Sequence, residues 1–189
     1  MARKIDLAAF KESLALLDKK LAQANISIEI KAIGGFAMLY HQIRKDGYTQ
    51  DIDTVTPDYS SEVQTLIEEV GNELDIDANW LNNDNVLDND VETAELILEP
   101  FWDRLDWGFT NIELYVADVE TILRSKVIAA EDDDLSLRTQ DFPDLIDIFE
   151  SMGTTTAEEC IEQCLSFGVS LTEYPRVLQR IIRVMKSMD

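Results

Sequence analysis

The sequence predicts an α/β (α+β) fold, in which a mixed sheet is flanked by helices and followed by a helical C-terminal portion. Stretches rich in isoleucine, or alternating apolar with polar residues, are typical of strands and fall within the first 116 residues. Beyond them the regular pattern is helical, with apolar residues three and four apart. Two adjacent glycines, Gly34 and Gly35, separate the first strand pattern from a helix pattern. These three observations place the sheet in the first half of the chain and helices in the second.

The first half begins with an amphipathic helix that Asn25 ends. The glycine pair then turns the chain from a strand into a short helix, and a second strand follows. Gly71 is expected to close the next helix. In chain order, the predicted elements are a helix over 6–24, a strand over 26–33, a helix over 36–44, a strand over 49–56 and a helix over 63–70.

In the second half, the clean alternation over 111–116 predicts the best strand. Before it, Trp80 and Leu81 are expected to anchor a turn, residues 83–90 a loop, 92–99 a short helix or an edge strand, and 102–108 an aromatic-rich loop. Helices are expected after Asp118, over 142–151, after a capping box near Thr156, and from Pro175 onward. No internal repeat and no low-complexity linker interrupts this series.

The charge balance excludes some partners. The chain has 16 basic and 38 acidic residues, a formal net charge of −22. Such a surface repels nucleic-acid backbones, so generic DNA binding is disfavoured. The excess acid is explained either by solubility or by a basic partner. The one basic cluster, near the end of the chain, comprises Arg176, Arg180, Arg183 and Lys186.

The remaining composition indicates a cytoplasmic protein. The chain contains no run of roughly 18 apolar residues, the length that a membrane span needs, and the N-terminal segment lacks the apolar core of a signal peptide. Cys160 and Cys164 are expected on one helix face as small apolar residues. With His41 as the single histidine, a zinc site is not expected.

The candidate chemistry lies at Asp51 and Asp53. Alternate side chains of a strand point to the same face, so these two carboxylates are expected to project together, with Ile52 turned to the core. Two carboxylates beside a glycine turn suit a divalent cation and the phosphates that it carries. The alternative is a solvated strand end next to a tight turn.

This arrangement resembles the signature of the nucleotidyltransferase superfamily, in which a glycine pair and a short helix precede a strand with Asp-x-Asp. Later stretches resemble one branch, the small bacterial proteins related to abortive-infection (AbiEii-type) toxins and to the DUF6036 group. These stretches are residues 79–82, the strand 112–116 leading to a helix with Lys126, and Arg138 with Asp141, Asp144 and Leu145. The match covers roughly residues 26–150.

The resemblance implies roles for individual residues. Asp51 and Asp53 are implied to hold Mg²⁺ on the triphosphate of an NTP, with Glu113 as a candidate third ligand. The implied nucleotide-binding residues are Gly34, Gly35, Thr49 and Lys126, and Asp141 or Asp144 is implied to orient Lys126 or to assist the acceptor. The alternatives are purely structural roles: Glu113 is an ordinary exposed strand residue, and Lys126 and Asp144 form a surface ion pair.

The sequence also departs from the family pattern. Members often carry Arg-x-Thr before Asp-x-Asp, and here Thr49 is present but Gly47 occupies the arginine position. Arg44 or Lys45 could substitute from the turn. Gly35 stands where many active transferases have a phosphate-holding serine.

Two functions are therefore carried forward, and a third, a purely structural interaction protein, remains only if the carboxylates bind no metal. The first is a Mg²⁺-dependent nucleotidyltransferase that moves a nucleotidyl group from an NTP to an RNA or protein acceptor, in one setting the toxin of a pair with an antitoxin as its partner. The second is a catalytically inactive nucleotide- or partner-binding module with the same fold. The expected domains are a nucleotidyltransferase-like domain over 1–150 and a helical extension over 151–189.

Overall fold

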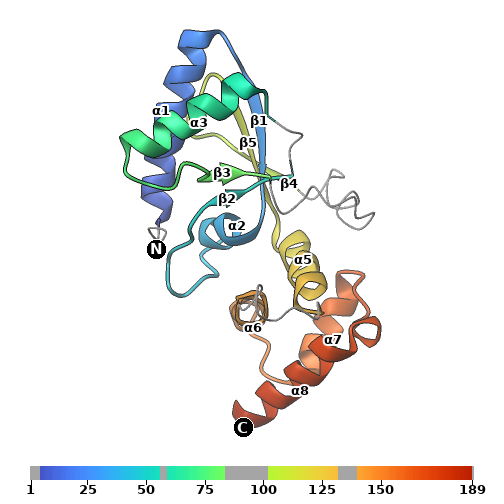
Figure 1. Ribbon diagram of the computed structural model, residues 1–189. Helices are drawn as coiled ribbons and strands as arrows, with labels where there is room; N and C mark the ends of the chain where they lie inside the picture. Colours follow the sequence, from blue (N-terminus) through green and yellow to red (C-terminus); the bar gives the residue numbers. More distant parts are fainter. Residues whose placement is uncertain (1–4, 56–58, 84–101, 132–139, 189) are drawn as a thin grey trace. The chain divides into compact units, whose positions relative to one another are not determined.

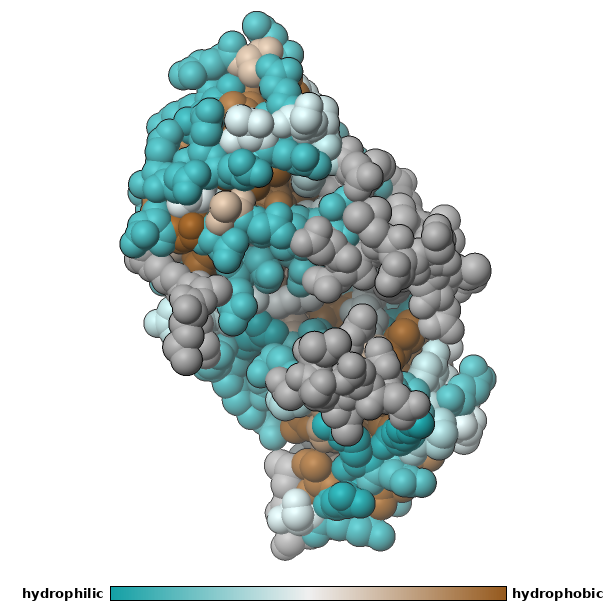
Figure 2. Space-filling view, viewed as in Figure 1, coloured by the Kyte–Doolittle hydropathy of each residue, from teal (hydrophilic) through white to brown (hydrophobic). Residues whose placement is uncertain are grey.

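The protein is a mixed α/β molecule with a helical C-terminal half. The computed structural model describes residues 5–55, 59–83, 102–131 and 140–188 (Figure 1). Arg138 and the elements expected over 83–90 (beyond Asn83) and 92–99 lie outside these residues. On the face drawn in Figure 2, the coloured residues are mostly hydrophilic, in keeping with the net charge of −22.

The chain forms two compact units. The first unit comprises Met1–Gln42 and Asp46–Asp118, and the second comprises Ile43–Lys45 and Val119–Asp189. This division differs from the expected ranges 1–150 and 151–189, because α5 and α6 pack together with the C-terminal helices. The assignment of 1–150 to a nucleotidyltransferase-like domain stays a prediction.

In the first unit, two helices lie side by side next to the strands (Figure 1). Helix α1 (Leu7–Ala24) begins at Asp6, whose carboxylate accepts a hydrogen bond from the Ala9 N–H, and ends at Asn25 in the left-handed conformation. Helix α3 (Ser61–Glu73) packs against α1. The apolar positions expected on the inner face of α1 are fully buried at Phe10, Leu14, Leu17 and Leu21.

The strands form two small sheets that meet at one bridge. Strand β5 (Ile112–Ala117) pairs in parallel with β1 (Ile28–Ala32) and antiparallel with β4 (Trp102–Leu105). Strand β2 (Ile52–Asp53) pairs in parallel with β3 (Leu81–Asn82). An antiparallel bridge between Ala32 and Thr54 joins β1 to the β2 segment. The strand predicted over 111–116 is therefore confirmed, whereas the loop predicted over 102–108 is wrong for its first four residues.

Two helices have boundaries that differ from the prediction. Helix α2 spans Gly34–Tyr40 rather than 36–44, because the glycine turn itself begins the helix and Gln42 adopts a left-handed φ of 58°. Gly71 does not close α3 but lies inside it. A Cβ at Gly71 would be 2.6 Å from the backbone oxygen of Asp77, so this glycine serves close packing rather than helix termination.

The regular elements described in the second unit are all helices. Helix α5 (Val119–Glu131) packs against α6 (Asp141–Ser151) and α8 (Pro175–Met188), and α7 (Ala157–Ser166) packs against α8. A short 3₁₀ helix, Leu171–Glu173, precedes α8. The expected capping box is confirmed: the Thr156 hydroxyl accepts from the Glu159 N–H, and the Glu159 carboxylate accepts from the Thr156 N–H.

Candidate functional site

The glycine turn and Asp53 lie against each other in the first unit. Strand β1 ends at Ala32, and the next residue, Ile33, donates its N–H to the backbone oxygen of Asp53 at 2.9 Å. Gly34 has a φ of +60°, a conformation that disfavours residues with a side chain. A Cβ at Gly34 would also be 2.9 Å from Asp53 Oδ2. A glycine is therefore needed here both for the backbone conformation and for the approach of the carboxylate.

The burial pattern at Asp51 and Asp53 fits the alternation expected of a strand. Ile52 between them is fully buried, while both aspartates are half-buried, which is the alternation of a strand with one face in the core. Asn82 of β3 is the direct neighbour of Asp53 in the parallel register. The structure thus brings Asp51, Asp53, Asn82 and the Gly34 turn together in one region of the first unit.

Two further residues implied to bind the nucleotide have ordinary backbone roles. Thr49 forms both hydrogen bonds of an antiparallel bridge with Ile5, at 2.7 and 3.0 Å. Gly35 is buried in the first turn of α2. These contacts fix the position of the chain before β2 and at the start of α2.

Glu113 is not brought to the two aspartates. It lies opposite Glu29 in the β1–β5 register, whereas Asp53 bonds to Ile33, four residues further along β1. Four residues correspond to about 13 Å along a strand. The Glu113 side chain is 59% exposed and lies 3.6 Å from the Arg104 guanidinium. Within the described residues, no group of three or more His, Cys, Asp or Glu side chains could hold a metal ion.

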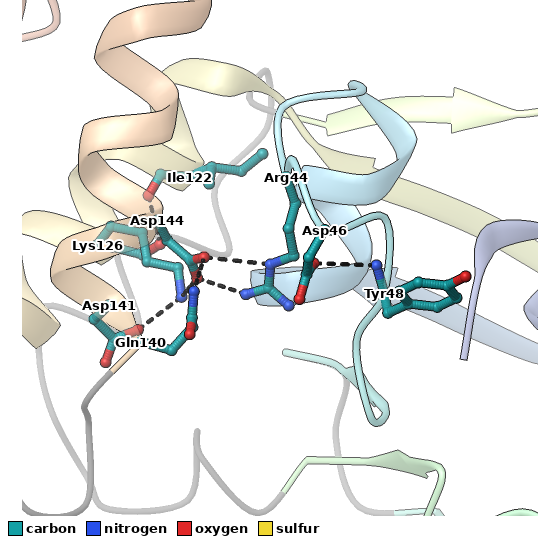
Figure 3. A network of polar contacts seen from close by, with 9 residues as sticks. Arg44, Asp46, Tyr48, Ile122, Lys126, Gln140, Asp141 and Asp144 are labelled. Atoms are coloured by element: carbon teal, nitrogen blue, oxygen red, sulfur yellow. Dashed lines mark hydrogen bonds and ion pairs between the residues drawn. The ribbon is translucent and has the colours of Figure 1, made fainter. Parts of the chain in front are cut away.

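Lys126, Asp141 and Asp144 form a buried ionic network in the second unit (Figure 3). Lys126 of α5 lies 2.7 Å from Asp141 Oδ1 and 2.9 Å from Asp144 Oδ2. Asp144 is fully buried, and it also accepts two hydrogen bonds from Arg44, at 2.6 and 3.2 Å, and one from Gln140 at 3.1 Å. Asp141 and Asp144, two of the three aspartates of α6, therefore contact Lys126.

The network balances its own charges, with two cations and two carboxylates. Burial by itself lowers the pKa of Lys126, but the attraction of Asp144 and Asp141 outweighs it, so the pKa of Lys126 is raised. The stabilisation linked to a raised lysine pKa is fully present below the unfolded value of about 10.4 and is lost as the pH rises through the folded value. Lys126 is therefore a charged, carboxylate-bound group throughout the neutral range.

The two residues that could replace the missing arginine also belong to the second unit. Arg44 binds Asp144, and Lys45 binds Asp147 at 3.3 Å as well as Glu150. Gly47 has a φ of +71°, and a Cβ there would meet no atom within 4 Å. The glycine is thus favoured by the turn itself.

Arg44 and Gln140 are members of the network that sequence reasoning missed. Arg44 is 100 residues from Asp144, and no local pattern marks it as a partner. Asn82, which lies beside Asp53, enters the sequence analysis only as part of the stretch 79–82 that resembles the nucleotidyltransferase branch, with no role of its own at the site.

Comparison with known proteins adds no family assignment. No protein-family model matches the chain, and neither the curated proteins nor the solved structures contain a match. Among the described residues, no helix combines the length and the apolar character needed to cross a membrane.

Proposed function

We propose that this chain is a Mg²⁺-dependent nucleotidyltransferase that moves a nucleotidyl group from an NTP to an oxygen of an RNA or protein acceptor, with pyrophosphate as the leaving group. The observation that carries the proposal is the contact of Asp53 with the Gly34 turn, with Asp51 two residues earlier and the residue between them, Ile52, buried in the core. Two carboxylates, with phosphate oxygens and water, form an oxygen ligand set that Mg²⁺ accepts. Two protein ligands are thus supplied without Glu113.

Each residue has a defined part in this proposal. When bound, Mg²⁺ would orient the phosphates and offset the charge that develops on them. Asp51 and Asp53 would hold the ion, and Ile52 between them fixes their position because its own side chain is buried in the core. The absence of a side chain at Gly34 lets the Asp53 carboxylate lie against the turn, where a phosphate bound to the ion would be close to the backbone.

A second candidate is a catalytically inactive nucleotide- or partner-binding module. Its specific support is the ionic network, because Arg44 and Lys126 are both bound to Asp144 and Lys126 also to Asp141. Cations bound to carboxylates in this way are poor candidates for neutralising the phosphates of an NTP unless the network opens. Glu113, whose place in the register is beside Glu29, supports the same reading.

Isothermal titration calorimetry with Mg²⁺ and each NTP tests nucleotide binding. We expect binding by the wild type and its loss in the double variant Asp51→Asn/Asp53→Asn, which removes the two charges and keeps the side-chain shape. Asp103→Asn, an exposed carboxylate on β4 of the same unit, is the matched control and should bind normally. A wild-type protein that shows no nucleotide-dependent heat would refute both candidates as nucleotide-binding proteins.

Label transfer separates the two candidates. The protein is incubated with NTPs labelled on the α-phosphate, together with total RNA or a cell lysate. Label on an acceptor that disappears in Asp51→Asn/Asp53→Asn supports the transferase. Nucleotide binding without transfer supports the inactive module.

A cellular assay addresses the toxin setting. Induced expression of a toxin should arrest growth, and the Asp51→Asn/Asp53→Asn variant should not. Growth arrest that the inactive variant also causes would exclude nucleotidyl transfer as its origin.

A further inference from the structure

Lys31 shares a sheet face with the proposed metal ligands. Ala32 and Thr54 are directly opposite each other and fully buried, so their neighbours Lys31, Ile33, Asp53 and Val55 face the other way. The register places Lys31 opposite Val55 and diagonal to Asp53. The backbone oxygen of Lys31 accepts a hydrogen bond from the Val55 N–H at 3.0 Å. Diagonal neighbours on one face lie about 7 to 8 Å apart, which is within reach of a lysine.

A neighbouring ring holds the Lys31 side chain. Tyr115 of β5 is the direct partner of Lys31 in the parallel register, and the Lys31 ammonium lies over its ring, 6.0 Å from the centroid. The side chain is only 15% exposed, and its ammonium lies 3.5 Å from Glu29. The Lys31 ammonium therefore lies on this face beside Tyr115 and Glu29, and the side chain has to turn toward its diagonal neighbour Asp53 to contact a ligand there.

Among the described strand residues of the first unit, Lys31 is the cation whose register places it diagonal to Asp53. Between Asp46 and Asp118 the sequence contains one basic residue, Arg104, against many acidic ones. Arg104 lies on β4, beyond β5, and its side chain is 67% exposed beside Glu113. Arg44 binds Asp144 within the second unit.

We propose that Lys31 contacts the phosphates of the nucleotide held at Asp51 and Asp53, and so supplies the positive charge that Gly47 lacks. The inference rests on the proposed nucleotide binding. A triphosphate carries more negative charge than one Mg²⁺ neutralises, and the carboxylates of the site add to the excess. A lysine one diagonal step from Asp53 offsets part of it.

Calorimetry on Lys31→Met tests the proposal. The substitution keeps the length of the side chain and removes its charge. Because hydrogen bonds to charged groups contribute about 1.5 to 3 kcal/mol, we expect Mg²⁺–NTP binding to weaken by about tenfold or more. Lys31→Arg should retain most of the affinity. Lys19→Met makes the same charge change on the exposed side of α1 and should leave binding within about twofold of the wild type.

A Glu29 variant separates a direct contact from a screening effect. If Lys31 acts only by neutralising Glu29, adding Glu29→Gln to Lys31→Met will restore the affinity, and the proposal fails. If Lys31 contacts phosphate, the double variant stays weak, and Glu29→Gln alone binds at least as tightly as the wild type. Wild-type binding that Lys31→Met leaves unchanged also overturns the proposal. No binding by the wild type would instead refute the proposed function.

Discussion

Replacing Asp144 with asparagine tests how strongly the ionic network stabilises the second unit. The substitution keeps the side-chain shape and removes the charge from a fully buried group that contacts Arg44 and Lys126 at 2.6 and 2.9 Å. Two poorly exposed cations then face the single carboxylate of Asp141. Removing one partner of a buried ion pair costs about 3 to 5 kcal/mol, so we expect the free energy of unfolding of this unit to fall by about that amount.

The chain supplies a convenient assay for this change. Its three tryptophans, Trp80, Trp102 and Trp107, all belong to the first unit. Tryptophan fluorescence therefore follows unfolding of the first unit, whereas far-ultraviolet circular dichroism follows the helices of both. In a denaturant titration of Asp144→Asn, the dichroism transition should move to lower denaturant concentration more than the fluorescence transition does.

Two variants make the result decisive. Glu150→Gln removes a carboxylate that pairs with the exposed Lys45. It should lower the free energy of unfolding much less than Asp144→Asn does. The double variant Asp144→Asn/Lys126→Met leaves one cation, Arg44, and one carboxylate, Asp141. Its loss in free energy of unfolding should therefore be smaller than the sum of the losses in the two single variants. Equal stability of Asp144→Asn and Glu150→Gln would refute the reasoning.

Three other predictions follow from local geometry. Gly34→Ala should lower the free energy of unfolding by about 1 to 2 kcal/mol, because a left-handed φ is unfavourable for alanine and its Cβ meets Asp53 Oδ2. Denaturant titration measures this change. An unchanged midpoint would contradict the prediction. Burial raises the pKa of the Cys164 thiol to about 12 and also raises the pKa of Cys160. Neither cysteine should therefore react with iodoacetamide in the native protein at pH 8, and mass spectrometry would show rapid labelling only after denaturation. Thr156→Ala removes the cap of α7 and should cost about 1 kcal/mol, whereas Thr156→Ser should be nearly neutral in the same titration.

Much of the fold follows from local patterns. The apolar spacing of α1, the strand character of β5 and the cap at Thr156 each depend on residues close together in the sequence, and the structure confirms them. Two buried cysteines on one face of α7 follow from the same helical spacing. In each case the information that determines the element lies within the element.

The differences arise where distant contacts decide. Strand β4 forms because it pairs with β5, although its own sequence resembles an aromatic-rich loop. Gly71 remains inside α3 because the backbone of Asp77 lies against it. At the candidate site, the orientation of Asp51 and Asp53 could be predicted from strand alternation. The partnership of Arg44 with Asp144 could not, because nothing near Arg44 marks a residue 100 positions away.

The three-residue segment Ile43–Lys45 has a consequence for synthesis of the protein on the ribosome. Arg44 leaves the ribosome 100 residues before its partner Asp144. At about 5 to 20 residues per second, this delay is about 5 to 20 seconds. Residues 1–42 of the first unit precede the segment, and residues 46–118 are made during the interval, while the second unit still lacks the carboxylate that Arg44 binds. The first unit can therefore fold as its last strand emerges, whereas completion of the second must wait for α6.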